Sequence, residues 1–295
     1  MKEQYQQHHL VCFWEHVESI VDKALIEDRI SQDVTTRALI PDCLEGKAAI
    51  IAKAEGILAG VEIAKAVVMH VDPTLSFDVH ITDGHRVKKG DVVATVSGEI
   101  VSILKAERPA LNFLCHLSGI ATDTSKYVEA VKGTKAKITD TRKTTPGLRP
   151  FEKYAVRIGG GHSHREHLGD WILIKDNHLS ALRCLGLGIK DAVELARSGS
   201  LAGETTKVEV EVNSFDQAVE ALEAGADIVM LDNMSIAEMK RVMKLDHGQA
   251  LIEASGGMNL DNVRSVAELG VDLISIGALT HSSKALDLSL KLVTC

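Results

Sequence analysis

Aromatic residues are scarce in this chain, at 3% of its 295 residues, so its core must be built mainly from aliphatic side chains. Alanine, valine, leucine, isoleucine and glycine are abundant instead, and hydrophobic residues make up 45% of the chain. This balance suits α/β packing, in which β-branched strands lie under helices rich in alanine and leucine.

Long apolar runs are also missing, and none approaches the roughly 20 residues that a membrane-spanning helix needs. The apolar stretch Leu10–Trp14 is too short for a signal peptide. Cysteines are few and scattered, with no C-x-x-C pair, which favours reduced thiols over disulfides or zinc ligands. They are Cys12, Cys43, Cys115, Cys184 and Cys295. Together these absences predict a soluble cytoplasmic protein.

Excess positive charge is absent, because the formal net charge is −8. Nucleic-acid-binding proteins need a cationic surface, so a nucleic-acid partner is disfavoured. No G-x-G-x-x-G follows a strand-like segment, which disfavours a dinucleotide-binding fold. The sequence also lacks the paired-acid motif V-x-D-D-x-x-x-T-G, which disfavours the class of purine and orotate phosphoribosyltransferases. It shows no Ser-His-Asp or Cys-His arrangement, so an activated serine or cysteine nucleophile is not expected.

The first 116 residues mix helical and strand-like segments without a steady alternation, which predicts a small α+β domain. We expect helices over 15–28 and 61–70, strands over 47–54 and 75–81, and a hairpin whose turns contain Gly84 and Gly90. A long helix over about 102–132 ends this region. A final helix over about 283–295 should pack on the same domain.

Residues 117–282 have a regular rhythm of strand-like segments, several of them separated by helices such as 215–224 and 260–269. The six strand-like segments are 138–141, 171–175, 207–212, 227–232, 250–255 and 272–277. Strands joined by helical crossovers form parallel sheets. Six or more such units favour a closed or nearly closed β/α barrel.

Polar residues follow these strands in an ordered way: cations after the early ones, acids after the middle ones and glycine turns after the last. A charged residue after one strand is commonly just a solvated loop, but six successive cases indicate a site, because β/α barrels build their active sites at the carboxyl ends of their strands. The residues concerned are Arg142, Lys143, Lys175, Asp176, Asn177, His178, Glu209, Glu211, Asp232, Asn233, Ser255, Gly256, Gly257 and Gly277.

Cations outnumber acids by seven to four between Arg142 and His178, although the chain is acidic overall. Arginine grips carboxylate and phosphate through its fork of donors, so this excess fits a small polyanionic ligand. Surface ion pairs are the alternative, and they account well for Lys153 and Arg157, which share a helix with Glu152.

Glu211 and Asp232 stand at the ends of consecutive strands, where two acids beside an anionic ligand call for Mg²⁺ between them. Glu209 lies two residues before Glu211, so both side chains point to the same face of the strand. The spacing therefore leaves open which of the two acids binds the metal or the ribose. The turns at 254–259 and 275–282 have the glycines that let backbone N–H groups approach a phosphate.

Several long segments resemble the quinolinate phosphoribosyltransferase family, and the likeness runs over nearly the whole chain. The most specific is TRKTTPGLRPFEKYAVRIGGGHSHREHLGDWILIKDNH at 141–178. The others are ERPALNFLCHLSGIAT (107–122), VEVEV (208–212), AGADIVMLDN (224–233), EASGG (253–257) and SIGALTHS (275–282).

The resemblance implies an amino-terminal α+β sandwich domain and an incomplete, seven-stranded β/α barrel, in a homodimer or larger assembly whose active sites are shared between subunits. It implies that quinolinate and phosphoribosyl pyrophosphate, with Mg²⁺, give nicotinate mononucleotide, pyrophosphate and CO2 on the route to NAD. Arg142, Lys143, Lys175, Glu211 and Asp232 would be catalytic.

The resemblance also assigns the remaining binding roles. Quinolinate would be held by Arg142, His164, Arg165 and Lys175, with Arg108 from the partner chain. Lys143, beside Thr141, would meet the pyrophosphate or ribose, while Glu211 and Asp232 would bind the ribose hydroxyls and the metal. The 5′-phosphate would lie among Ser255, Gly256, Gly257, Gly277, Ala278, Leu279 and His281.

Three alternatives stay open at this point. His164 would, on a second interpretation, only orient Arg165. The second alternative is a related phosphoribosyl or nucleotide enzyme that acts on another base. The third is a sensor that binds a nucleotide or a pyridine carboxylate without catalysis. The segment EDRISQDVTT (27–36) also departs from the family, because Ile30 and Gln32 replace its usual glycines.

Overall fold

The computed structural model describes residues 2–199 and 206–294. These residues form two compact units that interleave along the chain. The first unit comprises 1–125, 145–160 and 282–295, and the second comprises 126–144 and 161–281. We predicted one boundary between residues 116 and 117 and a second near 282, after which the carboxyl-terminal segment packs on the first domain. The chain passes between the units at four points, and the last of them lies between residues 281 and 282.

The first unit contains a four-stranded antiparallel sheet in the order β12-β1-β5-β3 and a two-stranded pair, β2-β4. The strands are β1 (Glu45–Ala52), β2 (Gly56–Ile57), β3 (Ser76–Val79), β4 (Arg86–Val87), β5 (Val92–Glu99) and β12 (Leu288–Thr294). The helices are α1 (Lys2–Glu27), the 3-10 turn η1 (Ile30–Gln32), α2 (Val34–Leu39), α3 (Val61–Val71), α4 (Ile100–Ala130) and α5 (Arg149–Ile158).

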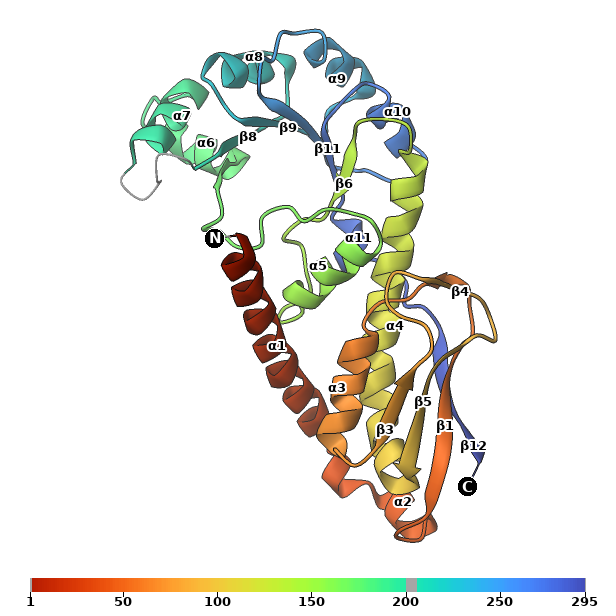
Figure 1. The fold of residues 1–295 in the computed structure, drawn as a ribbon. Helices are drawn as coiled ribbons and strands as arrows, with labels where there is room; N and C mark the ends of the chain where they lie inside the picture. The colour runs from red at the N-terminus through yellow and green to blue at the C-terminus, as the bar shows by residue number, and fades with distance from the viewer. Residues whose placement is uncertain (1, 200–205, 295) are drawn as a thin grey trace. The chain divides into compact units, whose positions relative to one another are not determined.

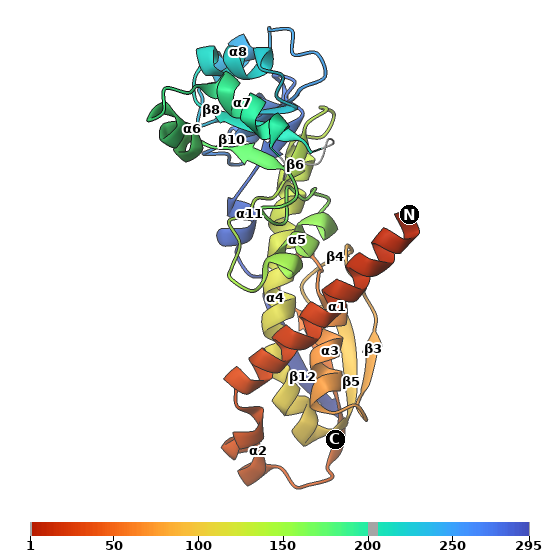
Figure 2. The same cartoon turned by 90° about the vertical axis from the view of Figure 1, so that its left-hand side faces the viewer.

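The helices of this unit confirm the predicted apolar spacing. In α3 the residues that recur every three or four positions, among them Ile63, Ala64 and Val67, are buried. Figures 1 and 2 show α3 beside α1 and the long helix α4 running along the sheet. At Gly119 of α4 an added Cβ would lie 2.8 Å from Cα of Ala285, so a glycine is needed for this close approach.

One prediction for this unit is wrong. The carboxyl-terminal segment is strand β12 rather than a helix, and it pairs antiparallel with β1. Its leucines alternate at positions 288, 290 and 292, which is the period of a strand. The expected hairpin is formed by β3 and β5, which pair antiparallel from Ser76↔Ser97 to Val79↔Ala94. Between these strands Gly84 and Gly90 have the positive φ values of turns, 86° and 98°, and the short strand β4 pairs with β2.

The segment with the unusual Ile30 and Gln32 forms a compact turn in place of a glycine loop. Arg29 takes the left-handed conformation, with φ of 49°, and the 3-10 turn η1 follows. Asp33 then caps α2 by accepting hydrogen bonds from the backbone N–H groups of Thr35 and Thr36, at 3.1 and 3.0 Å.

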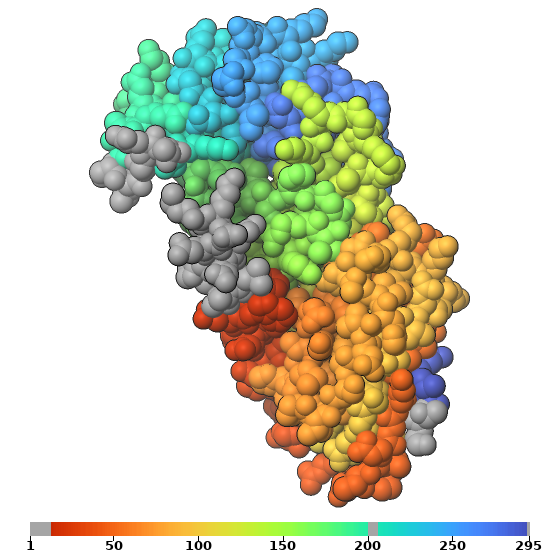
Figure 3. All heavy atoms as spheres, viewed as in Figure 1, coloured from red at the N-terminus to blue at the C-terminus, as the bar shows by residue number. Residues whose placement is uncertain are grey.

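The second unit is built on a parallel sheet in the order β6-β11-β10-β9-β8-β7. All six predicted strands are present, with bounds β6 (Lys137–Thr139), β7 (Ile172–Ile174), β8 (Val208–Val212), β9 (Ile228–Asp232), β10 (Leu251–Ser255) and β11 (Leu273–Ser275). Its helices are α6 (Asp176–Arg183), α7 (Ile189–Ser198), α8 (Phe215–Glu223), α9 (Ile236–Val242), α10 (Val263–Ala267) and α11 (Ala278–His281). In Figure 3 helices α7 to α9, coloured green-cyan to blue, form the visible outer surface of this unit.

The strand order makes the sheet an incomplete barrel. The first strand, β6, lies beside the last, β11, so the sheet curls round and leaves its opening between β6 and β7. The described residues form six regular strands, one fewer than the seven expected. On the open edge of β6 stands a single parallel bridge between Thr139 and His162, where a further strand would lie.

Three cysteines, Cys43, Cys115 and Cys184, have free thiols, as predicted. Cys295 and the side chain of Cys12 lie outside the described residues. Across the described part of the chain, every helix is too short or too polar to cross a membrane.

Candidate active site

The carboxyl ends of the parallel strands gather most of the predicted site residues on one edge of the second unit. In the strand ladder Asp232, the last residue of β9, lies opposite Ser255, the last residue of β10. Glu211 of β8 lies opposite Met230 of β9. Because all six strands run in the same direction, the loops that follow them open at the same mouth.

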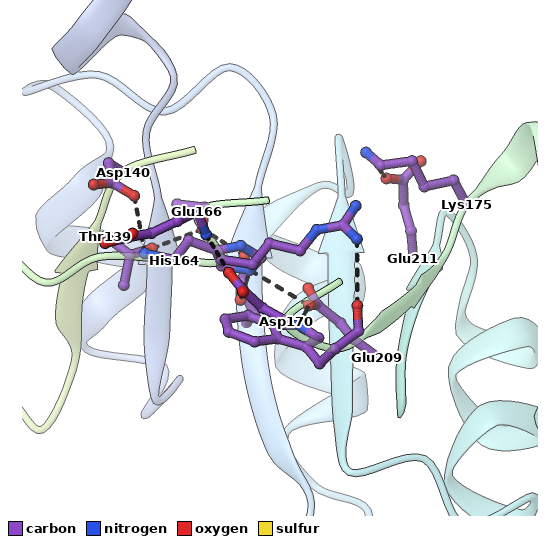
Figure 4. Close-up of polar contacts among 12 residues, drawn as sticks. Thr139, Asp140, His164, Glu166, Asp170, Lys175, Glu209 and Glu211 are labelled. Carbon is purple, nitrogen blue, oxygen red and sulfur yellow. Dashed lines mark hydrogen bonds and ion pairs between the residues drawn. The ribbon is translucent and has the colours of Figure 1, made fainter. Parts of the chain in front are cut away.

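Lys175 and Glu211 face each other across the ends of β7 and β8 (Figure 4). The Lys175 ammonium donates to Oε2 of Glu211 at 3.0 Å, and the two side chains are 46% and 15% exposed. His178 in the first turn of α6 accepts from the backbone N–H of Lys175 through Nδ1, at 2.9 Å, which fixes the start of this helix. An accessible cation and an acid therefore stand together at the mouth.

Glu209 lies one layer deeper than Glu211, and this separates the two acids that spacing left open. Glu209 is fully buried, and its Oε2 accepts from Nε1 of Trp171 at 2.7 Å. Glu211 is the acid of the pair at the mouth, where a ligand can reach it.

Arg165 and His164 lie just below the mouth and are 6% and 8% exposed. Burial of the Arg165 guanidinium and the nearby charge of Arg142 both lower the pKa of Arg165. Two guanidinium groups close enough to repel each other form a strong anion-binding site, because an anion between them relieves the repulsion.

His164 is surrounded by acids from two strands. Its Nε2 lies 3.4 Å from Oε2 of Glu209 and 3.4 Å from Oε2 of Glu253 in β10. Burial alone would lower the pKa of His164, yet the two carboxyl groups raise it to about 9. Burial also raises the pKa of Glu253, which the charge of the neighbouring His164 opposes. His164 is therefore positively charged near neutral pH.

The turn after β10 requires glycine at its first position. Gly256 has φ of +82°, and an added Cβ would lie 2.7 Å from the backbone nitrogen of Asn233. Asn233 in turn donates from Nδ2 to Oδ2 of Asp232 at 2.8 Å, and its backbone N–H donates to the carbonyl of Ser255 at 3.0 Å. Gly257, with φ of +61°, faces open space. The glycine turn thus packs directly against the loop that carries Asp232.

A second glycine turn meets Lys143. A Cβ at Gly277 would lie 3.0 Å from Cδ of Lys143 and 3.2 Å from Nε2 of His281. Thr280 Oγ1 donates to the backbone carbonyl of Lys143 at 2.7 Å, which joins the loop after β6 to the loop after β11. Within the first of these loops the Lys143 N–H donates to Oγ1 of Thr141 at 3.0 Å.

Leu279 and Arg108 were both predicted to bind a ligand, and the structure places their side chains in very different surroundings. Leu279 is 1% exposed, so a ligand could meet only its backbone, together with that of its neighbour Ala278 at the start of α11. Arg108 lies in α4 of the first unit, with a side chain 64% exposed and 3.8 Å from Oε1 of Glu107.

The cations between 142 and 178 are divided between the two units. Arg149, Lys153 and Arg157 belong to α5 of the first unit. Only Arg142, Lys143, Arg165 and Lys175 stand in the second.

Sequence reasoning missed several polar residues beneath the mouth: the buried Thr139, Asp140, Glu253 and Ser275, and the partly buried Trp171. Asp140, fully buried, accepts from the backbone N–H of His164 at 2.9 Å. The detectable signal was a single acid inside the apolar strand LIEAS (251–255). A charged residue in a strand that is buried on both faces needs a specific partner.

Two family models match this chain, and together they cover nearly all of it. The model described as the quinolinate phosphoribosyl transferase N-terminal domain matches residues 33–118. The model of the corresponding C-terminal domain matches residues 120–291.

Curated relatives and solved structures agree with these models. The carboxylating nicotinate-nucleotide pyrophosphorylase of Mycobacterium leprae is 39% identical, over 95% of this chain and 99% of the relative. The crystal structure of NadC from Streptococcus pyogenes is 42% identical with a TM-score of 0.88, over 95% of this chain and 97% of that chain. The nicotinate-nucleotide pyrophosphorylase from Francisella tularensis is 37% identical with a TM-score of 0.88, over 95% and 96%.

Proposed function

The chain belongs to the quinolinate phosphoribosyltransferase family, and on that premise we propose that it transfers a phosphoribosyl group from phosphoribosyl pyrophosphate to quinolinate, with loss of CO2. The observation that carries the proposal is the pair of neighbouring guanidinium groups, Arg142 and Arg165, with the charged His164 beside them. Quinolinate has two adjacent carboxylates, and such a group of cations fits that dianion.

The quinolinate subsite is completed by Lys175, whose ammonium is accessible at the mouth. A ligand carboxylate would compete with Glu211 for this ammonium, which would leave the acid able to bind the ribose hydroxyls or a cation. Binding of quinolinate to Lys175 would in this way free Glu211 to bind in the ribose subsite.

The phosphoribosyl pyrophosphate subsite lies, in this proposal, between Asp232 and the two glycine turns. Gly256, Gly257 and Gly277 let backbone N–H groups approach the 5′-phosphate, and Lys143 stands beside Gly277, where it can meet the pyrophosphate. Ser255, opposite Asp232 in the ladder, borders the same turn.

Glu211 and Asp232 fit Mg²⁺, a hard cation that needs only one or two protein carboxylates when it is also bound by phosphate oxygens. Bound there, Mg²⁺ would neutralise charge on the departing pyrophosphate.

The reaction follows from positioning and charge, because the pyridine nitrogen is already a nucleophile. Its lone pair forms a bond to C1 of the ribose as the C1–O bond to pyrophosphate breaks, and pyrophosphate leaves with that electron pair. Lys143 stabilises the leaving group. The adjacent C–CO2 bond then breaks and CO2 departs. Its electron pair stays on the ring carbon, stabilised by the neighbouring positive nitrogen, until that carbon takes a proton from solvent.

Arg108 and the assembly are a further part of the proposal. The exposed Arg108 side chain would complete the quinolinate subsite of a second copy of the chain. Mixing the inactive variants Arg108→Ala and Arg142→Ala would then restore up to about one quarter of wild-type activity, since half of the exchanged dimers would hold one intact site. No recovery in a mixture that demonstrably exchanges subunits would contradict sharing. The cytoplasmic location also remains a prediction.

The proposed function is tested by incubating the protein with quinolinate and phosphoribosyl pyrophosphate, with and without Mg²⁺, and measuring CO2 and pyrophosphate. Both products should appear in equal amounts and only with the metal. Turnover of nicotinate or orotate in place of quinolinate would indicate a related enzyme with another base. Tight binding of quinolinate without any product would indicate a sensor.

A further inference from the structure

A row of buried polar side chains crosses neighbouring strands of the second unit beneath the mouth. Thr139 of β6, Ser275 of β11 and Glu253 of β10 are at most 3% exposed. The hydroxyls of Thr139 and Ser275 are 2.7 Å apart, and Ser275 donates a short hydrogen bond to Oε1 of Glu253. Polar groups buried this deeply are costly unless each has a partner, so such a row points to a specific task.

The row ends at the ring of His164. Oε1 of Glu253 is occupied by Ser275, and its Oε2 faces Nε2 of His164 at 3.4 Å. Glu209 faces the same nitrogen from β8, held in turn by Trp171. Figure 4 shows His164 and Glu209 in this cluster, apart from the Lys175–Glu211 pair at the mouth.

His164 needs such support because the backbone around it is irregular. It lies two residues after the single bridge at His162 and outside any regular strand. Its N–H is fixed by Asp140, but the direction of its ring depends on its neighbours. These are Glu209, Glu253 and the ring of Trp171, whose centroid lies 5.0 Å away.

We propose that Glu253 is a positioning residue for the quinolinate subsite: anchored by Ser275 and Thr139, it holds the His164 ring in the orientation that binds a ligand carboxylate. This inference rests on the proposed function. Glu253 itself is fully buried and acts only through His164.

A metal ion is the competing explanation, because ligand atoms of His164, Glu209 and Glu253 lie within 4.8 Å of one another. Ser275 already donates to Oε1 of Glu253 and Trp171 to Oε2 of Glu209, so one oxygen of each carboxyl group is engaged by the protein itself. A protonated His164 ring, 3.4 Å from each carboxyl group, supplies the positive charge that a metal ion would otherwise bring. The metal content of the purified protein distinguishes the two explanations.

The test uses Glu253→Gln in the full chain, with both substrates varied separately. Glutamine offers one acceptor oxygen where glutamate offers two, so either Ser275 or His164 loses its acceptor. We expect the KM for quinolinate to rise by about 10- to 100-fold, as for a broken buried charge pair, while the KM for phosphoribosyl pyrophosphate stays within about twofold. Glu223→Gln, which removes an exposed carboxylate on α8, is the matched control and should change neither value.

Ser275→Ala provides a second, milder variant if Glu253→Gln folds poorly. It leaves the carboxyl group in place but removes its anchor, so the quinolinate KM alone should rise, by about 3- to 10-fold. An unchanged quinolinate KM in both variants, or an equal rise in both KM values, would overturn the proposal. A stoichiometric metal in the wild type that Glu253→Gln loses would overturn it as well. Wild-type protein that fails to consume quinolinate would instead reject the proposed function.

Discussion

Alanine at Gly256 and alanine at Gly257 should have different consequences, although the two glycines are adjacent and both have positive φ. At Gly257, with φ of +61° and open space around it, the cost is that of the left-handed conformation, about 1–2 kcal/mol. At Gly256, with φ of +82°, the new Cβ would also lie 2.7 Å from the backbone nitrogen of Asn233. Overpacking of this kind adds about 1–3 kcal/mol.

The total is therefore about 2–5 kcal/mol at Gly256 against about 1–2 kcal/mol at Gly257. For a chain of this size each kcal/mol lowers Tm by roughly 2–4 °C, so Gly256→Ala should melt about 2–12 °C below Gly257→Ala. The clash also displaces Asn233, which holds Asp232 by a 2.8 Å hydrogen bond. The KM for phosphoribosyl pyrophosphate should accordingly rise more in Gly256→Ala.

Thermal unfolding and steady-state kinetics of the two variants, measured side by side, check this reasoning. Equal Tm values would refute the steric argument. A larger kinetic defect in Gly257→Ala would refute the link from Gly256 through Asn233 to Asp232.

Three further substitutions probe the cations of the site. Arg142→Ala should lose at least about 2–5 kcal/mol of transition-state stabilisation, measured as kcat/KM for quinolinate, and near wild-type kinetics would reject its role. Lys175→Ala should lower the same kcat/KM at least about tenfold yet move Tm by only a degree or two, because its ion pair with Glu211 is nearly half exposed and such pairs contribute about 0–1 kcal/mol. The pKa of His164 is raised from 6.5 to about 9 on folding, so the stability gained from its ion pairs is fully present below pH 6.5 and declines as pH rises through about 9. The difference in unfolding free energy between wild type and His164→Asn should shrink over that interval, and a constant difference would contradict a charged His164.

Much of the second unit could be predicted from the sequence because its strands are short β-branched runs separated by helical periodicity. The same logic missed β12, although its leucines at 288, 290 and 292 alternate as in a strand, because its partner β1 lies far earlier in the chain. Strand partners are set by long-range pairing, which local spacing does not contain. The pairing of β4 with β2 escaped prediction for the same reason.

The site residues at the mouth were predictable because parallel strands bring their carboxyl ends together. The choice between Glu209 and Glu211 was not, since both have the same parity and differ only in depth inside the sheet. Glu253 was overlooked because its proposed role is to position His164, which is 89 residues earlier in the chain. Contacts of that kind exist only after the sheet has curled.

The pairing of β12 with β1 has a consequence for how the molecule is made. Strand β1 ends at Ala52, but β12, which pairs with the side of β1 that β5 leaves open, begins at Leu288, so 235 residues must be synthesised between them. At about 5–20 residues per second, the nascent chain carries an unpaired β1 edge for roughly 10–50 s. During translation that bare edge is the part of the polypeptide most open to wrong strand partners, and a chaperone that shields it would act before the last few residues leave the ribosome.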